Sequence, residues 1–145
     1  MEYAIAQVEQ ILGGQKILGK KLESKMDLVE LGSIGITKNA VSHLANYLSL
    51  SWKQIADLLP VTDRTLNRYT SNQHFNSAVS EQVIHIAEVL AKGTEVFQEK
   101  RKLLLWLNTS HKVFSGKTPF ALLNSRFGTE LVLEELGRIE FGVYS

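Results

Sequence analysis

The residues with the clearest chemical potential form a short segment in the middle of the chain, Thr62-Asp63-Arg64-Thr65-Leu66-Asn67-Arg68. An arginine side chain can read a guanine edge, and an asparagine can read adenine. Threonine hydroxyls and a helix N-terminus can hold a phosphate. We therefore predict that DNA is contacted by the side chains of Thr62, Arg64, Thr65, Asn67 and Arg68, although exposed arginine and asparagine are also common on surfaces that bind nothing.

A helix-turn-helix is the element that would position these side chains. The sequence predicts two compact helices, 51–59 and 62–70, joined by a tight turn. Ser51 can cap the first helix, and the small Ala56 lets the second helix cross close to it. The positions expected to face inward are Ile55, Ala56, Leu59, Val61, Leu66 and Tyr69. Apolar residues around a small residue and a tight turn are typical of this motif.

One residue departs from the usual pattern of the motif. The turn often carries glycine, which reaches positive φ, but this chain has Pro60, whose φ is restricted to negative values. We therefore expect either a turn that is built differently or a changed crossing angle. Two helices around a tight turn also occur in all-α proteins that never bind DNA.

A second group of residues that could bind a partner follows Arg138, in the segment "GRIEFGVYS". Its aromatic and β-branched side chains are of the types that dominate interface energetics. Arg138 and the terminal carboxylate could occupy a polar pocket of a partner. From the pattern alone a second interpretation stays open, in which Phe141 and Tyr144 pack back into their own domain.

The sequence lacks the patterns of an active site or a metal centre. It contains no cysteine, no glycine-rich phosphate loop and no nucleophile motif. The histidines are His43, His74, His85 and His111. None of them has a second ligand at coordinating spacing. Glu134 is spaced to form a surface ion pair with Arg138. We expect a protein that is not an enzyme and that needs no metal, cofactor or small-molecule substrate.

Composition and charge narrow the possible partners. With 16 basic and 15 acidic residues the net charge is +1, so the chain is not a polybasic protein that coats nucleic acid. Any DNA binding must use a small local patch, doubled by dimerisation. The N-terminus lacks the pattern of a secretory signal, and no apolar run approaches the roughly 20 residues of a membrane span. We expect a soluble intracellular protein without a membrane partner.

Apolar periodicity predicts an all-α fold, because no stretch alternates long enough to indicate a sheet. Outside the helix-turn-helix, the expected helices cover residues 3–12, 25–31, 37–48, 80–97, 99–108, 118–124 and 129–140. Gly13-Gly14 and Gly32 are expected to end the first two. The expected N-caps of the other helices include Thr37, Ser80 and Thr129.

The last third of the chain carries the most specific pattern. Its elements are Trp106-Leu107-Asn108-Thr109, Phe114 with Gly116, Thr118-Pro119 with Leu122-Leu123, Phe127-Gly128, Val132, and the run from Glu134 through Gly142. Together they resemble the C-terminal toxin-binding domain of the Xre/MbcA/ParS antitoxins, whose partners are RES-domain toxins. Upstream, Gly35-Ile36, Ala40-Val41 and Ser80 fit the same family, so the resemblance spans roughly residues 30–145. Ser110-His111 departs from it, where a small turn built on proline or asparagine is expected.

The resemblance implies a bacterial, cytoplasmic antitoxin encoded beside its toxin. Such proteins form a homodimer, bind operator DNA and place the C-terminal domain over the toxin's active site. RES toxins resemble ADP-ribosyltransferases and consume NAD, so inhibition by occlusion is steric and uses no cofactor.

For this chain the resemblance implies a division of roles. Residues 1–76 are expected to dimerise and bind DNA, and residues 77–145 to form a small helical toxin-binding domain that ends in a plug. The residues of the plug are Arg138, Glu140, Phe141, Gly142, Val143, Tyr144 and Ser145.

Two other functions stay open. The chain could be a freestanding helix-turn-helix transcription regulator whose C-terminal half only mediates dimerisation. It could also be an interaction module with a vestigial helix-turn-helix that never binds DNA. The C-terminal pattern favours the antitoxin over the regulator, whereas the near-neutral charge does not exclude the interaction module.

Overall fold

The computed structural model describes residues 2–142. Within this range every secondary-structure element longer than a single bridge is a helix, as predicted. The helices are α1 (Glu2–Ile11), α2 (Gln15–Leu18), α3 (Lys25–Ile34), α4 (Lys38–Leu48), α5 (Trp52–Ala56), α6 (Asp63–Arg68), α7 (Ser77–Phe97), α8 (Lys100–Leu107) and α9 (Arg126–Glu140), with 3₁₀ turns η1 (Lys112–Phe114) and η2 (Phe120–Leu122). Within residues 2–142 one isolated strand-like pairing is present, and it joins Thr37 to His74.

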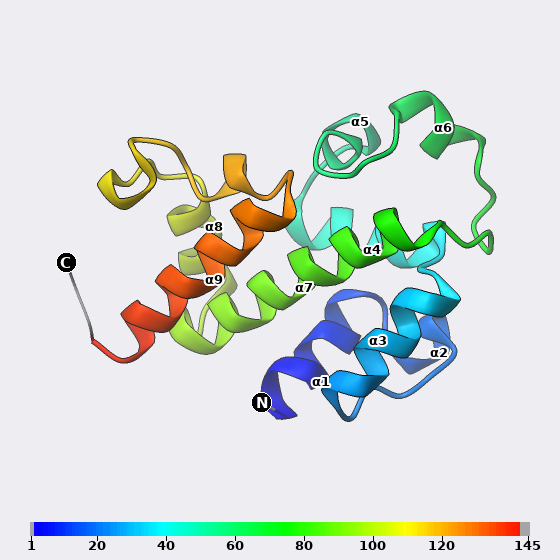
Figure 1. Cartoon of the computed structure of the whole chain (residues 1–145), viewed down its shortest axis with the longest axis horizontal. Coiled ribbons are helices and arrows are strands. Elements are labelled where there is room, and N and C mark those ends of the chain that lie inside the picture. Colours follow the sequence, from blue (N-terminus) through cyan, green and yellow to red (C-terminus); the bar gives the residue numbers. More distant parts are fainter. Residues whose placement is uncertain (1, 143–145) are drawn as a thin grey trace.

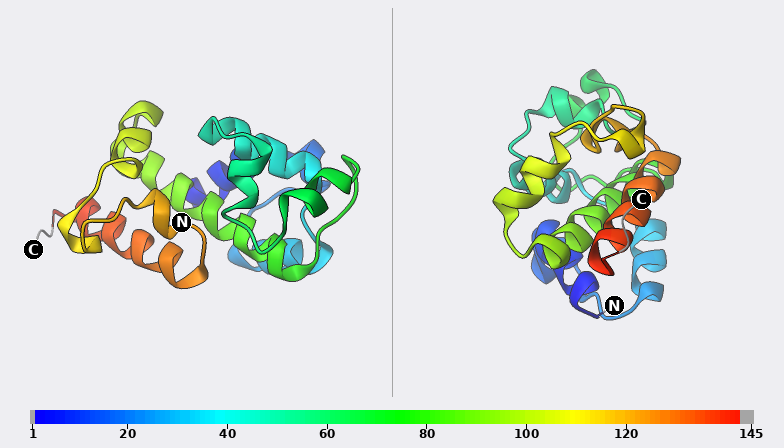
Figure 2. Two further views of the ribbon diagram at one scale, coloured as in Figure 1. Left: turned by 90° about the horizontal axis from the view of Figure 1, so that it is seen from above. Right: turned by 90° about the vertical axis from the view of Figure 1, so that its left-hand side faces the viewer.

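The long helix α7 is the centre of the molecule. It packs against α1 and α3 on one side and against α8 and α9 on the other (Figure 1). The two views of Figure 2 show α9 running along α7, with α5 and α6 on a separate lobe. The apolar residues of α7 lie on most sides of the helix, which explains its central position. Those that are fully buried include Val83, Ile86, Ala87, Val89, Leu90 and Ala91. Helices that are apolar on most sides are found in the interior.

Several boundaries follow local signals that the sequence shows directly. Thr37 caps α4 by accepting a hydrogen bond from the backbone N–H of Ala40, as predicted. Gly13 and Gly14, which end α1, have φ angles of 106° and 89°. These angles lie in the region that favours glycine, so the pair ends the first helix as expected.

The expected end of α3 at Gly32 was wrong, because α3 continues to Ile34. Gly32 lies inside the helix, at the contact with α7. A Cβ added at Gly32 would lie 3.5 Å from Glu81 Cγ, so a small residue fits this packing site. Gly35 ends the helix instead, with a φ of 97°. A Cβ there would lie 2.5 Å from the carbonyl oxygen of Phe75, so this position requires glycine both conformationally and sterically.

Two expected N-caps were also wrong. The side chain of Asn76, not Ser80, caps α7, and that of Ser125, not Thr129, caps α9. Both expected caps are buried one turn into their helices. In each case an earlier residue satisfies the free N–H groups of the first turn, so the helix begins sooner.

Three elements differ in extent from the sequence-based expectation. The short helix α2 follows the Gly13-Gly14 turn and was not expected. The helix expected at 118–124 is a single 3₁₀ turn, although Thr118 does accept a hydrogen bond from the N–H of Ala121. The helix-turn-helix pair is shorter than expected, because the residues after Ala56 form turns instead of extending α5.

Ser80 ties together three segments of the N-terminal lobe. Its fully buried hydroxyl accepts a hydrogen bond from the N–H of Ile36 (2.8 Å) and donates one to the carbonyl of Phe75 (3.3 Å). The hydroxyl therefore satisfies one backbone N–H and one backbone carbonyl in the interior.

Replacing Ser80 by alanine should lower the free energy of unfolding by about 1–3 kcal/mol, because the buried N–H of Ile36 then lacks an acceptor. Urea unfolding measures this change. The exposed Ser33→Ala is the matched control and should change stability by less than about 0.5 kcal/mol. Equal midpoints for the two variants would contradict the role given to Ser80.

The corner of the helix-turn-helix is built around Pro60 without glycine. The N–H of Val61 donates to the carbonyl of Leu59 at 2.8 Å, which closes a three-residue turn centred on the proline. Such a turn uses the negative φ that proline favours. Ile55, Ala56, Leu59 and Leu66 are all buried, as predicted. The turn is thus built differently from the common glycine form, and the two helices still share a core.

Candidate functional site

The first candidate surface is the N-terminal end of α6. Thr62 caps this helix by accepting a hydrogen bond from the N–H of Thr65 (3.0 Å), and its hydroxyl donates to the Thr65 hydroxyl (2.9 Å). Thr62 is exposed and Thr65 half-buried. The two threonines therefore shape the start of the helix, and Thr62 remains open to solvent.

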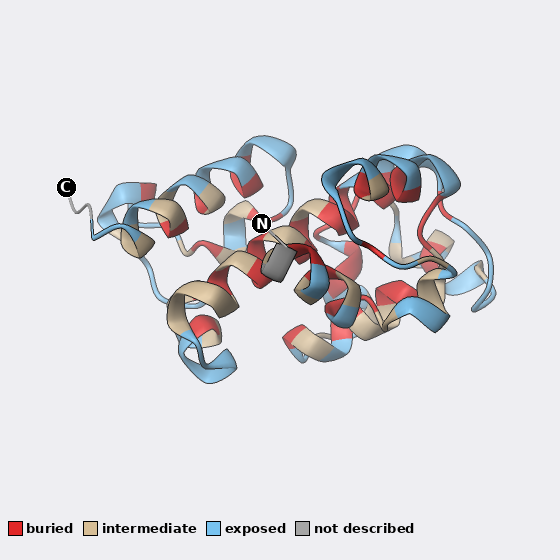
Figure 3. Ribbon diagram, turned by 90° about the horizontal axis from the view of Figure 1, so that it is seen from below, coloured by how far each residue is buried: buried red, intermediate tan, exposed pale blue. Residues whose placement is uncertain are grey.

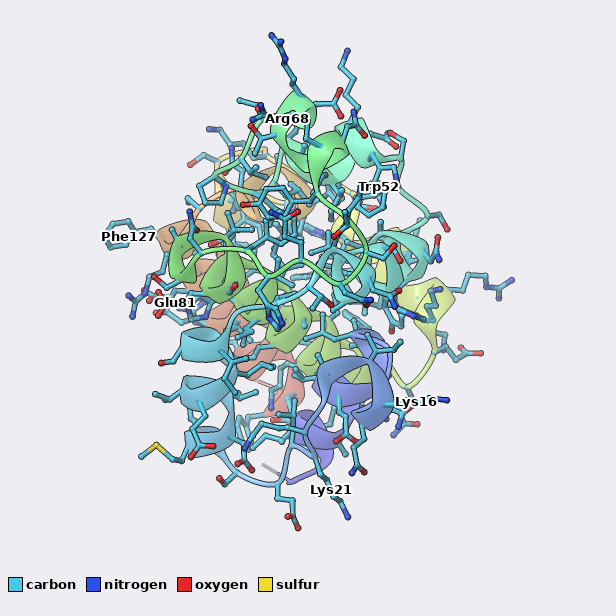
Figure 4. The ribbon with its side chains drawn as sticks, turned by 90° about the vertical axis from the view of Figure 1, so that its right-hand side faces the viewer. Lys16, Lys21, Trp52, Arg68, Glu81 and Phe127 are labelled. Carbon is cyan, nitrogen blue, oxygen red and sulfur yellow. The ribbon has the colours of Figure 1, made fainter. Side chains whose placement is uncertain are left out.

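The three long polar side chains of α6 are exposed. Arg64, Asn67 and Arg68 all lie on its outer surface, and Figure 4 shows Arg68 projecting away from the molecule. The Asn67 amide donates to the Asp63 carboxylate at 3.3 Å, a contact within one helical turn. The structure thus brings the five predicted DNA-binding residues onto one short helix at the edge of a lobe.

Lys38 on α4 holds the other end of α6, a role that the sequence did not reveal. Its ammonium donates to the carbonyl of Tyr69 (2.9 Å) and lies 5.2 Å from the centre of the Trp52 ring. The Tyr69 ring in turn stacks on Phe75, with centroids 4.4 Å apart. A cation at the C-terminal end of a helix interacts favourably with its dipole. Lys38 lies 31 positions before Tyr69, so no local spacing could have indicated that contact.

The second candidate surface is built on α8, η1, η2 and α9. Two contacts fix the start of α9 and the segment that leads into it. The buried Gln82 of α7 donates to the carbonyl of Leu123 at 2.7 Å, which holds the segment after η2. Gly128 of α9 packs so tightly on that segment that an added Cβ would lie 1.8 Å from the carbonyl oxygen of Leu122.

An aromatic cluster supports the loop between α8 and η2. Trp106 lies 5.3 Å from the ring of His111 and 6.3 Å from that of Phe114, measured between centroids. His111 Nε2 also makes a hydrogen bond with the carbonyl of Trp106 at 3.0 Å. A turn built on proline or asparagine was expected at Ser110-His111. Here the chain instead packs the His111 ring against the rings of Trp106 and Phe114.

The end of α9 presents Phe141 to solvent. This residue follows the last helical position, and its side chain is 78% exposed. Its N–H still donates to the carbonyl of Gly137, and Gly142 turns the chain with a φ of 70°. Phe141 is thus not packed into its own domain. The other expected plug residues Val143, Tyr144 and Ser145 lie outside the described residues.

Arg138 and Glu140, also expected in the plug, point to different sides of α9. Arg138 pairs with Glu135 (2.9 Å) and, as its spacing predicts, with Glu134 (3.8 Å). Glu140 forms an ion pair with Lys92 of α7, and that ammonium lowers the pKa of the Glu140 carboxyl. Lys92 also lies 3.7 Å from Glu95. The last turn of α9 is therefore anchored to α7 by a cation 48 positions away, which the sequence could not have shown.

Between residues 2 and 142 no group of three or more histidine and carboxylate side chains is placed to hold a metal ion. Over that range, none of the helices is both long and apolar enough to cross a membrane.

Comparisons with known proteins bear on the C-terminal surface. Residues 92–142 match the family described as the Antitoxin Xre/MbcA/ParS C-terminal toxin-binding domain. Antitoxin Xre of Yersinia enterocolitica is 25% identical over 120 residues, which cover 81% of this chain and 81% of that protein.

The fold also has a counterpart among solved structures. A chain of the M. tuberculosis MbcT–MbcA toxin–antitoxin complex superposes with a TM-score of 0.54 at 17% identity. The match covers 74% of this chain and 96% of that one. These findings confirm the resemblance to Xre/MbcA-type antitoxins and the all-α fold predicted from the sequence.

Proposed function

We propose that this chain is an antitoxin of the Xre/MbcA/ParS type, because residues 92–142 match the toxin-binding domain of that family. It neutralises a cognate RES-type toxin by occluding the active site. The observation that carries the proposal is the match of residues 92–142 to a toxin-binding domain, of which α9 and Phe141 form the last part. The proposed site of action is the bacterial cytoplasm.

The geometry of the end of α9 supports a steric mechanism. The Lys92–Glu140 ion pair fixes the last turn against α7, and the chain leaves this turn at the exposed Phe141. A helix end that is fixed in this way presents Phe141 in a defined position, so less conformational freedom of this residue is lost when a partner binds it. The antitoxin supplies no reacting group in this mechanism, and we propose that it is not an enzyme.

Co-purification and an enzyme assay test this function together. The chain, co-expressed with the RES-type toxin encoded beside it, should elute as one complex, and adding the chain to purified toxin should stop NAD consumption. A complex that consumes NAD at the rate of the free toxin would contradict occlusion. Operator binding without any toxin complex would favour the freestanding regulator.

We further propose that the chain binds its operator as a homodimer and represses its own operon through α6. The exposed Arg64, Asn67 and Arg68 and the capping Thr62 support this proposal, since their chemistry suits base edges and phosphates. The near-neutral chain charge means that specificity and affinity must come from this small surface, present twice in a dimer.

Replacing Arg64 or Arg68 by alanine should weaken operator binding by roughly 1–3 kcal/mol, because each substitution removes one base or phosphate contact. Fluorescence anisotropy over a salt series measures both affinity and the salt slope, which becomes shallower by about one for a lost phosphate contact. Lys21→Ala removes an exposed cation on a different part of the surface and is the matched control. Wild-type protein that fails to bind the upstream region even at low salt would indicate a vestigial helix-turn-helix.

A further inference from the structure

The outer face of α9 exposes large apolar side chains that the domain does not use. Phe127 is 82% exposed, Leu131 49% and Phe141 78%. Leu131, Glu134, Arg138 and Phe141 follow Phe127 by 4, 7, 11 and 14 positions, which places all five residues on one side of the helix. We call these five residues the α9 outer face. Figure 4 shows Phe127 extending away from the ribbon at one end of it.

The α9 outer face is not needed to pack α9 onto the rest of the domain. The opposite side of α9 is the buried one, and it carries Gly128, Thr129, Val132 and Leu136. In Figure 3 the same division is visible, with pale blue along the outside of α9 and red where it meets the molecule. The start of α9 is stabilised without Phe127, by the Ser125 cap and the Arg126–Glu130 ion pair. Large apolar side chains that share one exposed side of a helix are candidates for an interaction site.

A groove lies beside the outer face and shares residues with it. Its lining residues are Val113, Phe114, Ser115, Lys117, Leu122, Leu131 and Arg138. Val113 is itself 47% exposed. The exposed apolar side chains of the outer face thus lie beside a groove that contains the cations of Lys117 and Arg138. Phenylalanine and arginine are enriched at the centres of protein interfaces, so this composition is typical of a binding surface.

We propose that the α9 outer face docks on the body of the toxin and supplies most of the binding affinity, while the segment from Phe141 onward supplies the inhibition. This inference rests on the proposed antitoxin function. The toxin is the occupant because the whole face lies within residues 92–142, which match a toxin-binding domain. The face is also continuous with the proposed plug, since Phe141 belongs to both. From Phe127 to Phe141 the ridge is about 21 Å long at 1.5 Å per residue, enough for a contact well outside an active-site pocket.

Equilibrium binding and inhibition separate the two roles. Phe127→Ser and Leu131→Ser, in the full chain, should each raise the Kd for the toxin about tenfold or more, yet NAD consumption should still stop at saturating antitoxin. A chain that lacks residues 142–145 keeps Phe141 and therefore the whole outer face, so it should bind the toxin without stopping NAD consumption. Met26→Ser and Val29→Ser are the matched controls, because these α3 side chains are 63% and 60% exposed but lie outside residues 92–142.

A labelling experiment tests the contact independently of any loss of stability. The chain contains no cysteine, so Phe127→Cys introduces a single thiol on the outer face and Val29→Cys one on α3. Toxin should slow maleimide labelling of the first variant and leave the second unchanged.

The two proposals fail in different ways. If wild-type chain binds the toxin but the thiol of Phe127→Cys stays fully reactive in the complex, the docking inference is overturned and the antitoxin function stands. A change of oligomeric state in sedimentation, with unchanged toxin affinity for Phe127→Ser, would also overturn it and assign the face to a second copy. If the wild-type chain forms no complex with the toxin, the proposed function itself fails, and the inference fails with it.

Discussion

Deletion of residues 141–145 should abolish neutralisation of the toxin while leaving the fold and operator binding intact. The residues that pack α9 onto α7, Val132 and Leu136, lie before the deletion, and Phe141 contributes little burial at 78% exposure. The backbone bonds from Phe141 to Gly137 and from Gly142 to Ile139 are lost, but both lie at the exposed helix end. Growth of cells that co-express toxin and antitoxin is the measurement.

The deletion has clear controls in the same protein. Thermal unfolding and operator binding should match the wild-type chain, because α6 lies in a different lobe (Figure 2). The single substitution Phe141→Ala, which keeps the chain length, separates the role of the aromatic ring from that of the backbone. Continued growth of cells with the truncated antitoxin would rule out the plug.

Replacing Gly128 by alanine should lower the free energy of unfolding by about 2–3 kcal/mol. The new Cβ would lie 1.8 Å from the carbonyl oxygen of Leu122 and 2.8 Å from its carbonyl carbon. Both atoms are backbone, so no side-chain rotation can relieve the contact, and α9 must move away from η2. Because α9 carries both the outer face and the proposed plug, toxin affinity should fall together with stability.

The same helix contains the matched control. Gly137 has no atom within 4 Å of an added Cβ, so Gly137→Ala should stabilise the protein by about 0.5–1 kcal/mol through the better helix propensity of alanine. Urea unfolding of the two variants measures both changes. If Gly128→Ala unfolds at the urea concentration of the wild-type chain, the close α9–η2 contact does not contribute to stability.

Local sequence signals predicted much of the helical framework because their causes are local. A hydroxyl at position 37 or 51 can satisfy the first N–H groups of the helix that follows, and Thr37 and Ser51 both do so. The positive φ at Gly13 and Gly14 likewise depends on the residue itself. These effects act within one turn of the chain, so they can be recognised before the tertiary structure is known.

The same kind of local signal gave the wrong N-cap where two nearby residues could each cap the helix. Asn76 and Ser80 can both cap a helix, as can Ser125 and Thr129, and in each pair the earlier residue is the cap. The later hydroxyl was then free for another contact: Ser80 bonds to Ile36 and Phe75, and Thr129 donates to the carbonyl of Arg126. Packing of α7 and α9 against the core selects between such candidates, and no pattern of spacing contains that information.

From residue types at short spacing the sequence indicated the all-α class and the two helices around Pro60, and its C-terminal pattern resembles that of the Xre/MbcA/ParS antitoxins. Which of these residues are free to meet a partner depends instead on how the helices pack. This packing buries one side of α9 and leaves Phe127 and Phe141 exposed on the other, and it pairs Glu140 with Lys92. Exposure and long-range pairing depend on the three-dimensional arrangement of distant segments, and that arrangement is set by the packing of the whole core.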